Sequence, residues 1–193
     1  MKKVLVTGFE PFGNDTVNLA LEVVKALANE KIPNVNLVTL ILPVVFGKAI
    51  EALKAAIERE QPELVISLGQ AGDRNAINVE KLGININHAR IADNEGNQPN
   101  EEMIDPTGPA AYFTTIKISN TVESIKEAEI PAKVSFSAGT YVCNNLIYGI
   151  MHYLYSSKKH EKIKYGFIHI PYLPSIPLNL IKKAVQITIQ ANI

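Results

Sequence analysis

Residues 48–69, KAIEALKAAIEREQPELVISLG, place a helix, a break and a buried strand in succession. Over Lys48–Arg59 the apolar side chains recur at the spacing of one helical face. Pro62 then interrupts the helix, and Leu64–Leu68 forms a short apolar run that ends at Gly69. An apolar run of this length between turn residues is typical of a strand that is covered on both faces. The segment therefore predicts the helix–strand alternation of an α/β fold.

The same alternation extends over the rest of the chain. Further strands are predicted at Val4–Thr7, Val35–Leu42, Ile77–Ile86, Ala132–Phe136 and Tyr165–Ile170. Further helices are predicted at Asn18–Asn29, Ile118–Ala128, Cys143–Tyr155 and Pro177–Gln190. The polar segment Ala92–Pro109 has no periodicity and is predicted to be a long loop. Together these elements predict one domain, residues 1–193, built as a three-layer α/β/α sandwich around a mostly parallel, mixed sheet.

The composition excludes several classes of function. Of the 193 residues 47% are hydrophobic, and 19 basic side chains balance 19 acidic ones. Nucleic-acid-binding proteins usually carry an excess of Lys and Arg, so no nucleic-acid partner is expected. The apolar run at Val4–Thr7 is too short for an export signal, and no run is long enough for a membrane span. The only cysteine, Cys143, cannot form an intrachain disulfide, so we expect a soluble, cytoplasmic protein.

Loops that follow the carboxyl ends of parallel strands are where α/β folds place their chemistry. The first such loop lies within VTGFEPFG, residues 6–13, and carries the aromatic residues Phe9 and Phe12. Two interpretations are open. The rings plug the core beneath a surface loop, or they form the walls of a pocket for a small, flat, neutral ligand. The loop does not match a phosphate loop, because it lacks the Walker spacing and lysine, and Glu10 would repel an anion.

Two further strand ends carry the groups that thiol chemistry needs. Cys143 lies where a turn leads into a predicted helix, whose free N–H groups and positive end favour the nucleophilic thiolate. The same N–H groups are suited to hold the oxyanion of a tetrahedral intermediate. His169 ends an apolar strand just before a proline. Each residue alone is more commonly an inert core residue, but together they supply a nucleophile and a base.

A base works best when a third group orients its ring. Glu80 is the candidate, although an acidic side chain in an apolar stretch usually points to solvent. Asp73, Asp93 and Asp105 are competitors that position alone does not exclude. The other three histidines have no partners at metal-ligand spacing, so no metal site is predicted.

Six separated motifs run through the whole chain. They are VTGFEPFG (Val6–Gly13), LGQAG (Leu68–Gly72), DNEGNQP (Asp93–Pro99), GPAAYF (Gly108–Phe113), AGTYVCN (Ala138–Asn144) and HIPYLP (His169–Pro174). In order and spacing they resemble the pyrrolidone carboxyl peptidases, also called pyroglutamyl peptidases of the first type. The resemblance implies a phosphorylase/hydrolase-like sandwich and a cysteine peptidase that removes N-terminal pyroglutamyl residues from peptides, without metal or cofactor. It also implies a cytoplasmic homotetramer.

The resemblance assigns roles to individual residues. It implies a Cys-His-Glu triad of Cys143, His169 and Glu80, with an acyl-enzyme intermediate. It implies a substrate pocket whose residues are Phe9, Phe12, Gln70, Tyr141 and Val142, with Arg90 near the reacting carbonyl.

Two other functions remain open on the same sequence. A nucleoside phosphorylase or hydrolase on a similar sandwich would use the polar loops for ribose and phosphate, and thiol alkylation would leave its activity unchanged. A non-catalytic protein on a degenerate enzyme scaffold would bind 5-oxoproline without ever hydrolysing an amide. The intact set of Cys, His and Glu argues against the second of these.

Overall fold

A six-stranded sheet in the order β2-β1-β3-β8-β4-β7 lies at the centre of the computed structural model, which describes residues 1–13, 15–72, 74–172 and 176–193. The strands are β1 (Lys2–Phe9), β2 (Val35–Leu42), β3 (Leu64–Gln70), β4 (Ile77–Glu80), β7 (Ala132–Ser135) and β8 (Lys164–Ile170). Neighbouring strands are parallel except for β4 and β8, which run antiparallel. The sheet is therefore mostly parallel and mixed, which confirms the prediction.

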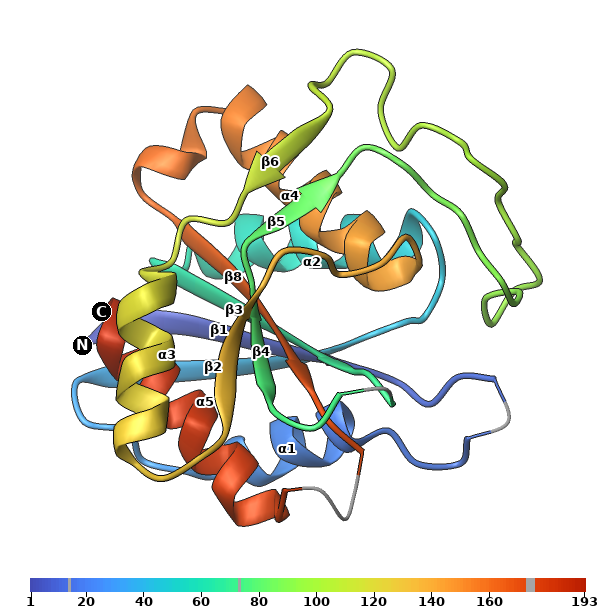
Figure 1. Ribbon diagram of the computed structural model, residues 1–193. Helices are drawn as coiled ribbons and strands as arrows, with labels where there is room; N and C mark the ends of the chain where they lie inside the picture. The colour runs from blue at the N-terminus through green and yellow to red at the C-terminus, as the bar shows by residue number, and fades with distance from the viewer. Residues whose placement is uncertain (14, 73, 173–175) are drawn as a thin grey trace.

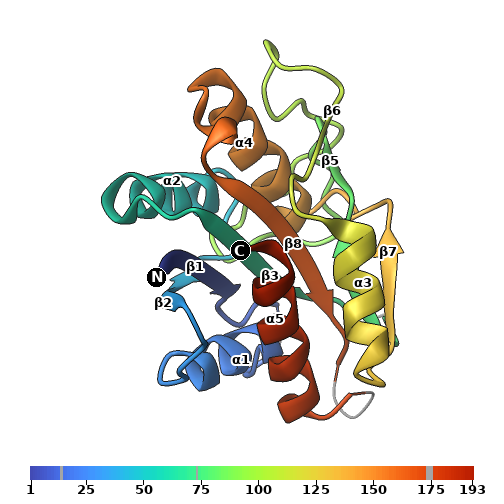
Figure 2. The ribbon, with the colours of Figure 1, turned by 90° about the vertical axis from the view of Figure 1, so that its left-hand side faces the viewer.

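Helices cover both faces of this sheet (Figures 1 and 2). One face carries α1 (Leu19–Leu27), α3 (Ile118–Glu127) and α5 (Leu178–Asn192), and the other carries α2 (Lys48–Glu60) and α4 (Val142–Ser156). Alternate residues of a strand point to opposite faces. In β8, Ile168 and Ile170 accordingly join the core under α1, α3 and α5, whereas Tyr165 and Phe167 join the core under α2 and α4. This is the predicted three-layer sandwich.

The ends of the helices follow local signals in the sequence. The side chain of Asn18 caps α1 by accepting a hydrogen bond from the backbone N–H of Ala20 over 2.9 Å. Gln61 takes a left-handed conformation and Pro62 follows it, so α2 ends there. Pro177, predicted to lie in the first turn of the last helix, is instead the residue that precedes it. None of the described helices is both long and apolar enough to cross a membrane.

The predicted strand at Ile77–Ile86 is two strands in different sheets. β4 belongs to the main sheet, whereas β5 (Leu82–Ile84) pairs with β6 (Ala111–Phe113), a strand that was not predicted. Lys81 lies at the break, where its N–H donates to Ser135 and its carbonyl accepts from Thr114. These backbone hydrogen bonds turn the chain out of the main sheet immediately after Glu80.

The segment Ala92–Pro109 contains no helix or strand, as predicted, and is held to the sandwich by side-chain hydrogen bonds. Asp93 is buried and accepts hydrogen bonds from the backbone N–H groups of Phe46, Glu95 and Asn97, each over 2.9 Å. Farther along, the N–H of Asp105 donates to the side chain of Asn85. These anchors fix the long loop over the ends of α2 and α4, where Figure 1 shows it.

Candidate active site

The pairing of β4 with β8 brings the candidate base and its acidic partner together. In this antiparallel pair His169 lies opposite Asn78, and Phe167 lies opposite Glu80. Glu80 is thus a diagonal neighbour of His169 on the same face of the sheet, within reach of a long side chain. The Nδ1 of His169 donates a hydrogen bond to Oε1 of Glu80 over 2.8 Å, because a carboxylate only accepts. The Nε2 of the ring remains for Cys143.

Both side chains of this pair are buried. Glu80 is 0% exposed and His169 is 4% exposed, so the interpretation that Glu80 points to solvent is wrong. The second carboxylate oxygen of Glu80 has no hydrogen-bond partner among the described residues. A buried carboxylate is costly unless a positive group lies beside it. The site therefore favours the protonated imidazole.

The competing aspartates are engaged elsewhere. Asp93 holds the turn at Asn97, and Asp105 pairs with His152, whose Nε2 lies 3.3 Å from its Oδ2. Asp73 lies outside the described residues. In the part of the chain that the structure covers, no three His, Cys, Asp or Glu side chains gather as metal ligands.

Cys143 is half-buried and is the second residue of α4, which begins after Tyr141 without a side-chain cap. The next residue, Asn144, is buried and anchors this end of the helix. Its Nδ2 donates to the carbonyls of Ile84 and Ile86, and its Oδ1 accepts from the N–H of Ile84, all over 2.9 Å. The cysteine therefore stands on a helix end that is fixed to the segment after β5.

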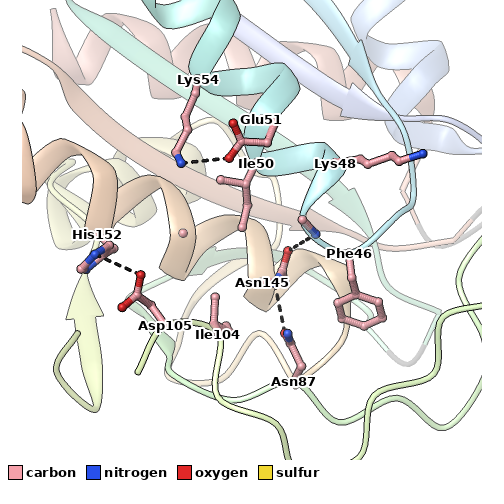
Figure 3. A pocket seen from close by; sticks show the side chains of 12 residues that line it. Phe46, Lys48, Ile50, Glu51, Lys54, Asn87, Ile104, Asp105, Asn145 and His152 are labelled. Atoms are coloured by element: carbon pink, nitrogen blue, oxygen red, sulfur yellow. Dashed lines mark hydrogen bonds and ion pairs between the residues drawn. The ribbon is translucent and has the colours of Figure 1, made fainter. Parts of the chain in front are cut away.

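Asn145 anchors the same helix end on its other side (Figure 3). Its Oδ1 accepts a hydrogen bond from the N–H of Gly47, just before α2, over 3.1 Å. Its Nδ2 donates to Oδ1 of Asn87 over 3.2 Å. Two consecutive buried amides thus fix the start of α4 to the residue before α2 and to residues 84–87, so the backbone that carries the thiol is held in place.

Gly69 makes room for the sulfur of Cys143. It lies beside His169 in the β3–β8 pair, on the face that α4 covers. A Cβ added at this position would come within 2.8 Å of Cζ of Phe167 and 3.0 Å of Sγ of Cys143. The absence of a side chain at residue 69 is therefore what lets the thiol approach the strand ends.

We expect Gly69→Ala to lower both stability and activity. Its methyl group would displace the ring of Phe167 or the sulfur, at a cost of about 1–3 kcal/mol of folding free energy. A shift of about 1 Å in a reacting atom lowers turnover about 100-fold. Denaturant unfolding and steady-state kinetics measure the two effects. Wild-type kinetics in this variant would show that the sulfur does not need the space.

The electrostatics of the site favour a positive His169. Burial alone lowers the pKa of His169, but the charge of Cys143 and hydrogen bonds with Cys143 and Glu80 outweigh it and raise the pKa to about 9. Because this value exceeds the ordinary 6.5, the protonated ring stabilises the fold. The contribution is complete below pH 6.5 and is lost as the pH rises through about 9.

The titration of His169 can be followed directly by NMR. We expect a midpoint near pH 9 for its ring signals in the wild type, and a lower midpoint in Cys143→Ala, where the negative partner is gone. A His169→Gln variant identifies the signals by their absence. A wild-type midpoint near 6.5 would contradict this account of the site.

A cavity of about 240 Å³ opens in front of these residues. The residues that line it include Phe9, Phe12, Gln70, Arg90, Tyr141, Val142, Cys143 and His169, so the structure brings together every residue assigned from the sequence except Glu80, which lies behind His169. Gln70 is held by the N–H of Leu19, which donates to its Oε1 over 2.6 Å. Its buried Nε2 meets no hydrogen-bond acceptor in the described parts of the chain.

Sequence reasoning assigned no role to five residues of this cavity. Ala71, Gly72 and Ala138 lie within the six motifs, whereas Asn18 and Val44 lie outside them. Asn18 was predicted only as the first residue of a helix; it caps α1 and also lines the cavity beside Gln70. Val44 carried no signal, because an apolar residue after a strand is expected to pack in the core. It lies at the cavity because its N–H donates to the carboxylate of Glu10 in the first loop.

A larger cavity of about 600 Å³ between α2 and α4 contains none of the predicted site residues (Figure 3). Its charged side chains are paired with each other or with near neighbours. Lys54 bonds to Glu51 over 3.0 Å, and His152 lies 3.3 Å from Asp105. With these charges compensated, the smaller cavity at Cys143 is the better candidate for catalysis.

Comparisons with known proteins show which family the chain belongs to. A family model described as pyroglutamyl peptidase matches residues 2–192. The pyrrolidone-carboxylate peptidase of Treponema denticola is 45% identical, over 98% of this chain and 92% of the relative. The crystal structure of pyroglutamyl peptidase I from Bacillus amyloliquefaciens has a TM-score of 0.94 at 47% identity, over 98% of this chain and 94% of that chain. Pyrrolidone carboxyl peptidase from Thermococcus litoralis has the same TM-score at 36% identity, over 100% and 93% of the two chains. The chain therefore belongs to the pyroglutamyl peptidase family.

Proposed function

We propose that the chain is a cysteine peptidase that removes N-terminal pyroglutamyl residues from peptides, with Cys143 as nucleophile, His169 as base and Glu80 as the group that orients the base. The observation that carries this proposal is the buried hydrogen bond of 2.8 Å between His169 and Glu80, directly beside the half-buried thiol. The raised pKa of His169 keeps a proton on the imidazole at neutral pH, ready for the departing amine.

The first half of the reaction breaks the peptide bond. The Cys143 thiolate attacks the carbonyl carbon of the pyroglutamyl residue, and the carbonyl oxygen becomes an oxyanion. Uncapped N–H groups in the first turn of α4 are suited to stabilise this charge. The C–N bond then breaks as His169 gives its proton to the departing amine, which leaves a thioester on Cys143.

The second half restores the enzyme. Water enters the place of the amine and loses a proton to His169 as it attacks the thioester carbonyl. The C–S bond breaks, 5-oxoproline leaves, and the thiolate and the imidazolium form again. Throughout, Glu80 holds Nδ1 and compensates the positive ring, so the reaction needs no large rearrangement.

The cavity suits a neutral, flat acyl group. A pyroglutamyl ring has a lactam in place of a charged amine, so its recognition requires apolar walls and a few polar partners and no carboxylate. Phe9, Phe12, Tyr141 and Val142 supply such walls. The free Nε2 of Gln70 is a donor for a ring oxygen.

We also propose that residues 1–193 form a single catalytic domain, which works as a cytoplasmic homotetramer. The match of the family model to residues 2–192 supports one domain. Sedimentation of the purified protein tests the tetramer, and fractionation of the source cells tests the location.

Hydrolysis of a fluorogenic pyroglutamyl amide, with and without iodoacetamide, tests the function. We expect hydrolysis that ceases when one equivalent of reagent has modified Cys143, and no hydrolysis of the matching prolyl amide, which lacks the ring carbonyl. Activity that depends on phosphate and survives alkylation would indicate a phosphorylase or nucleoside hydrolase instead. Binding of 5-oxoproline without any turnover would indicate a non-catalytic protein.

A further inference from the structure

A second hollow, of about 550 Å³, adjoins the catalytic cavity. The two share three lining residues, Phe12, Arg90 and Tyr141, so they lie side by side. The catalytic cavity, at about 240 Å³, has room for the acyl residue. The peptide beyond the cleaved bond must leave this cavity, and the second hollow is adjacent to it.

Hydrogen bonds hold the walls of this second hollow in position. The N–H of His88 donates to the carbonyl of Thr140 over 3.0 Å, and the hydroxyl of Thr140 donates back to the carbonyl of His88 over 2.7 Å. The hydroxyl of Tyr141 donates to the carbonyl of Ala92 over 3.0 Å. The wall is thus tied to the residues that lead directly into Cys143, and its position relative to the sulfur is fixed.

The charge of the hollow is positive. The guanidinium of Arg90, which is exposed and always charged, lines it, and no acidic side chain is among the described residues that do so. Two nearby carboxylates, those of Glu10 and Asp93, keep their negative charge because their hydrogen-bond donors are neutral, but neither lines the hollow. Glu10 accepts from Val44 and Asn94, and Asp93 accepts from the backbone and side chain of Asn97.

We propose that this hollow binds the residue that follows the cleaved bond, and that Arg90 favours an acidic residue there. In a dipeptide the free carboxylate would take the same place. The inference rests on the proposed function, since it assigns the leaving-group side of the same reaction. Two opposite unit charges about 4 Å apart in water attract each other strongly enough to change kcat/KM about fivefold.

Two unlabelled peptides that differ at one position test the proposal, with the release of 5-oxoproline measured by chromatography. Both begin with pyroglutamate, and the next residue is Glu in one and Gln in the other. We expect kcat/KM for the Glu peptide to exceed that for the Gln peptide about fivefold at low salt. In 1 M salt, where charges are screened beyond about 3 Å, the ratio falls towards one.

Variants locate the source of the preference. Arg90→Gln lowers the ratio of the two kcat/KM values, whereas Lys183→Gln, on the exposed surface of α5, leaves the ratio unchanged while also removing a basic side chain. A wild-type ratio near one, a ratio insensitive to salt, or a ratio that Arg90→Gln retains would overturn the proposal. Cleavage of neither peptide would instead refute the proposed function itself.

Discussion

Cys143→Ala is expected to lower kcat/KM for a pyroglutamyl amide by at least about 10⁴-fold. Loss of the nucleophile removes the covalent route and leaves only the binding energy and the oxyanion donors of the helix end. The fold tolerates the change, because the residue is half-buried beside an open cavity and its anchors are Asn144 and Asn145. Initial rates of hydrolysis measure the loss.

Binding and unfolding serve as controls for this variant. Calorimetry should show that Cys143→Ala still binds 5-oxoproline, because the walls of the cavity come from other residues. Its denaturant midpoint should remain close to that of the wild type. If the variant retained a rate within tenfold of the wild type, the sulfur would not be the nucleophile.

Glu80→Gln is expected to lower kcat by about 10²–10⁴-fold with little change in shape. The amide keeps the volume of the carboxylate but removes the negative charge that stabilises the protonated ring, so the pKa of His169 falls. The alkaline limb of the pH–rate profile reports loss of the imidazolium, and it therefore moves to lower pH. Rates measured across the pH range test both effects.

Asp105→Asn is a matched control for this second prediction. Asp105 also pairs with a histidine, His152, at 3.3 Å, but it lies outside the cavity that contains Cys143. We expect its kcat and its pH profile to match the wild type. If Glu80→Gln behaved like this control, the carboxylate would serve the fold and not the reaction.

The fold could be predicted from the sequence where hydrophobic patterns are long. The helical face of Lys48–Arg59 and the apolar run of Leu64–Leu68 each identify their element, and both are observed within two residues of the predicted bounds. The strand at Ile77–Ile86 could not be divided in advance. Its break depends on the hydrogen bond that Lys81 donates to Ser135 and the one that it accepts from Thr114, and both partners are distant in the chain.

The candidate site could be predicted only in part. Cys143 and His169 stand at element ends, where sequence patterns indicate chemistry. Glu80 could not be separated from the aspartates by pattern, because its contact with His169 depends on the antiparallel register of β4 and β8. The role of Gly69 could not be predicted either, since the space that it leaves is occupied by residues distant in sequence.

Mass spectrometry of the enzyme after rapid acid quench tests the central claim most directly. With a pyroglutamyl ester, whose leaving group departs quickly, the thioester should accumulate before water removes it. The account predicts one added pyroglutamyl group on the peptide that contains Cys143, formed and lost at rates that match turnover. Full turnover without an adduct, or an adduct on another residue, would contradict it.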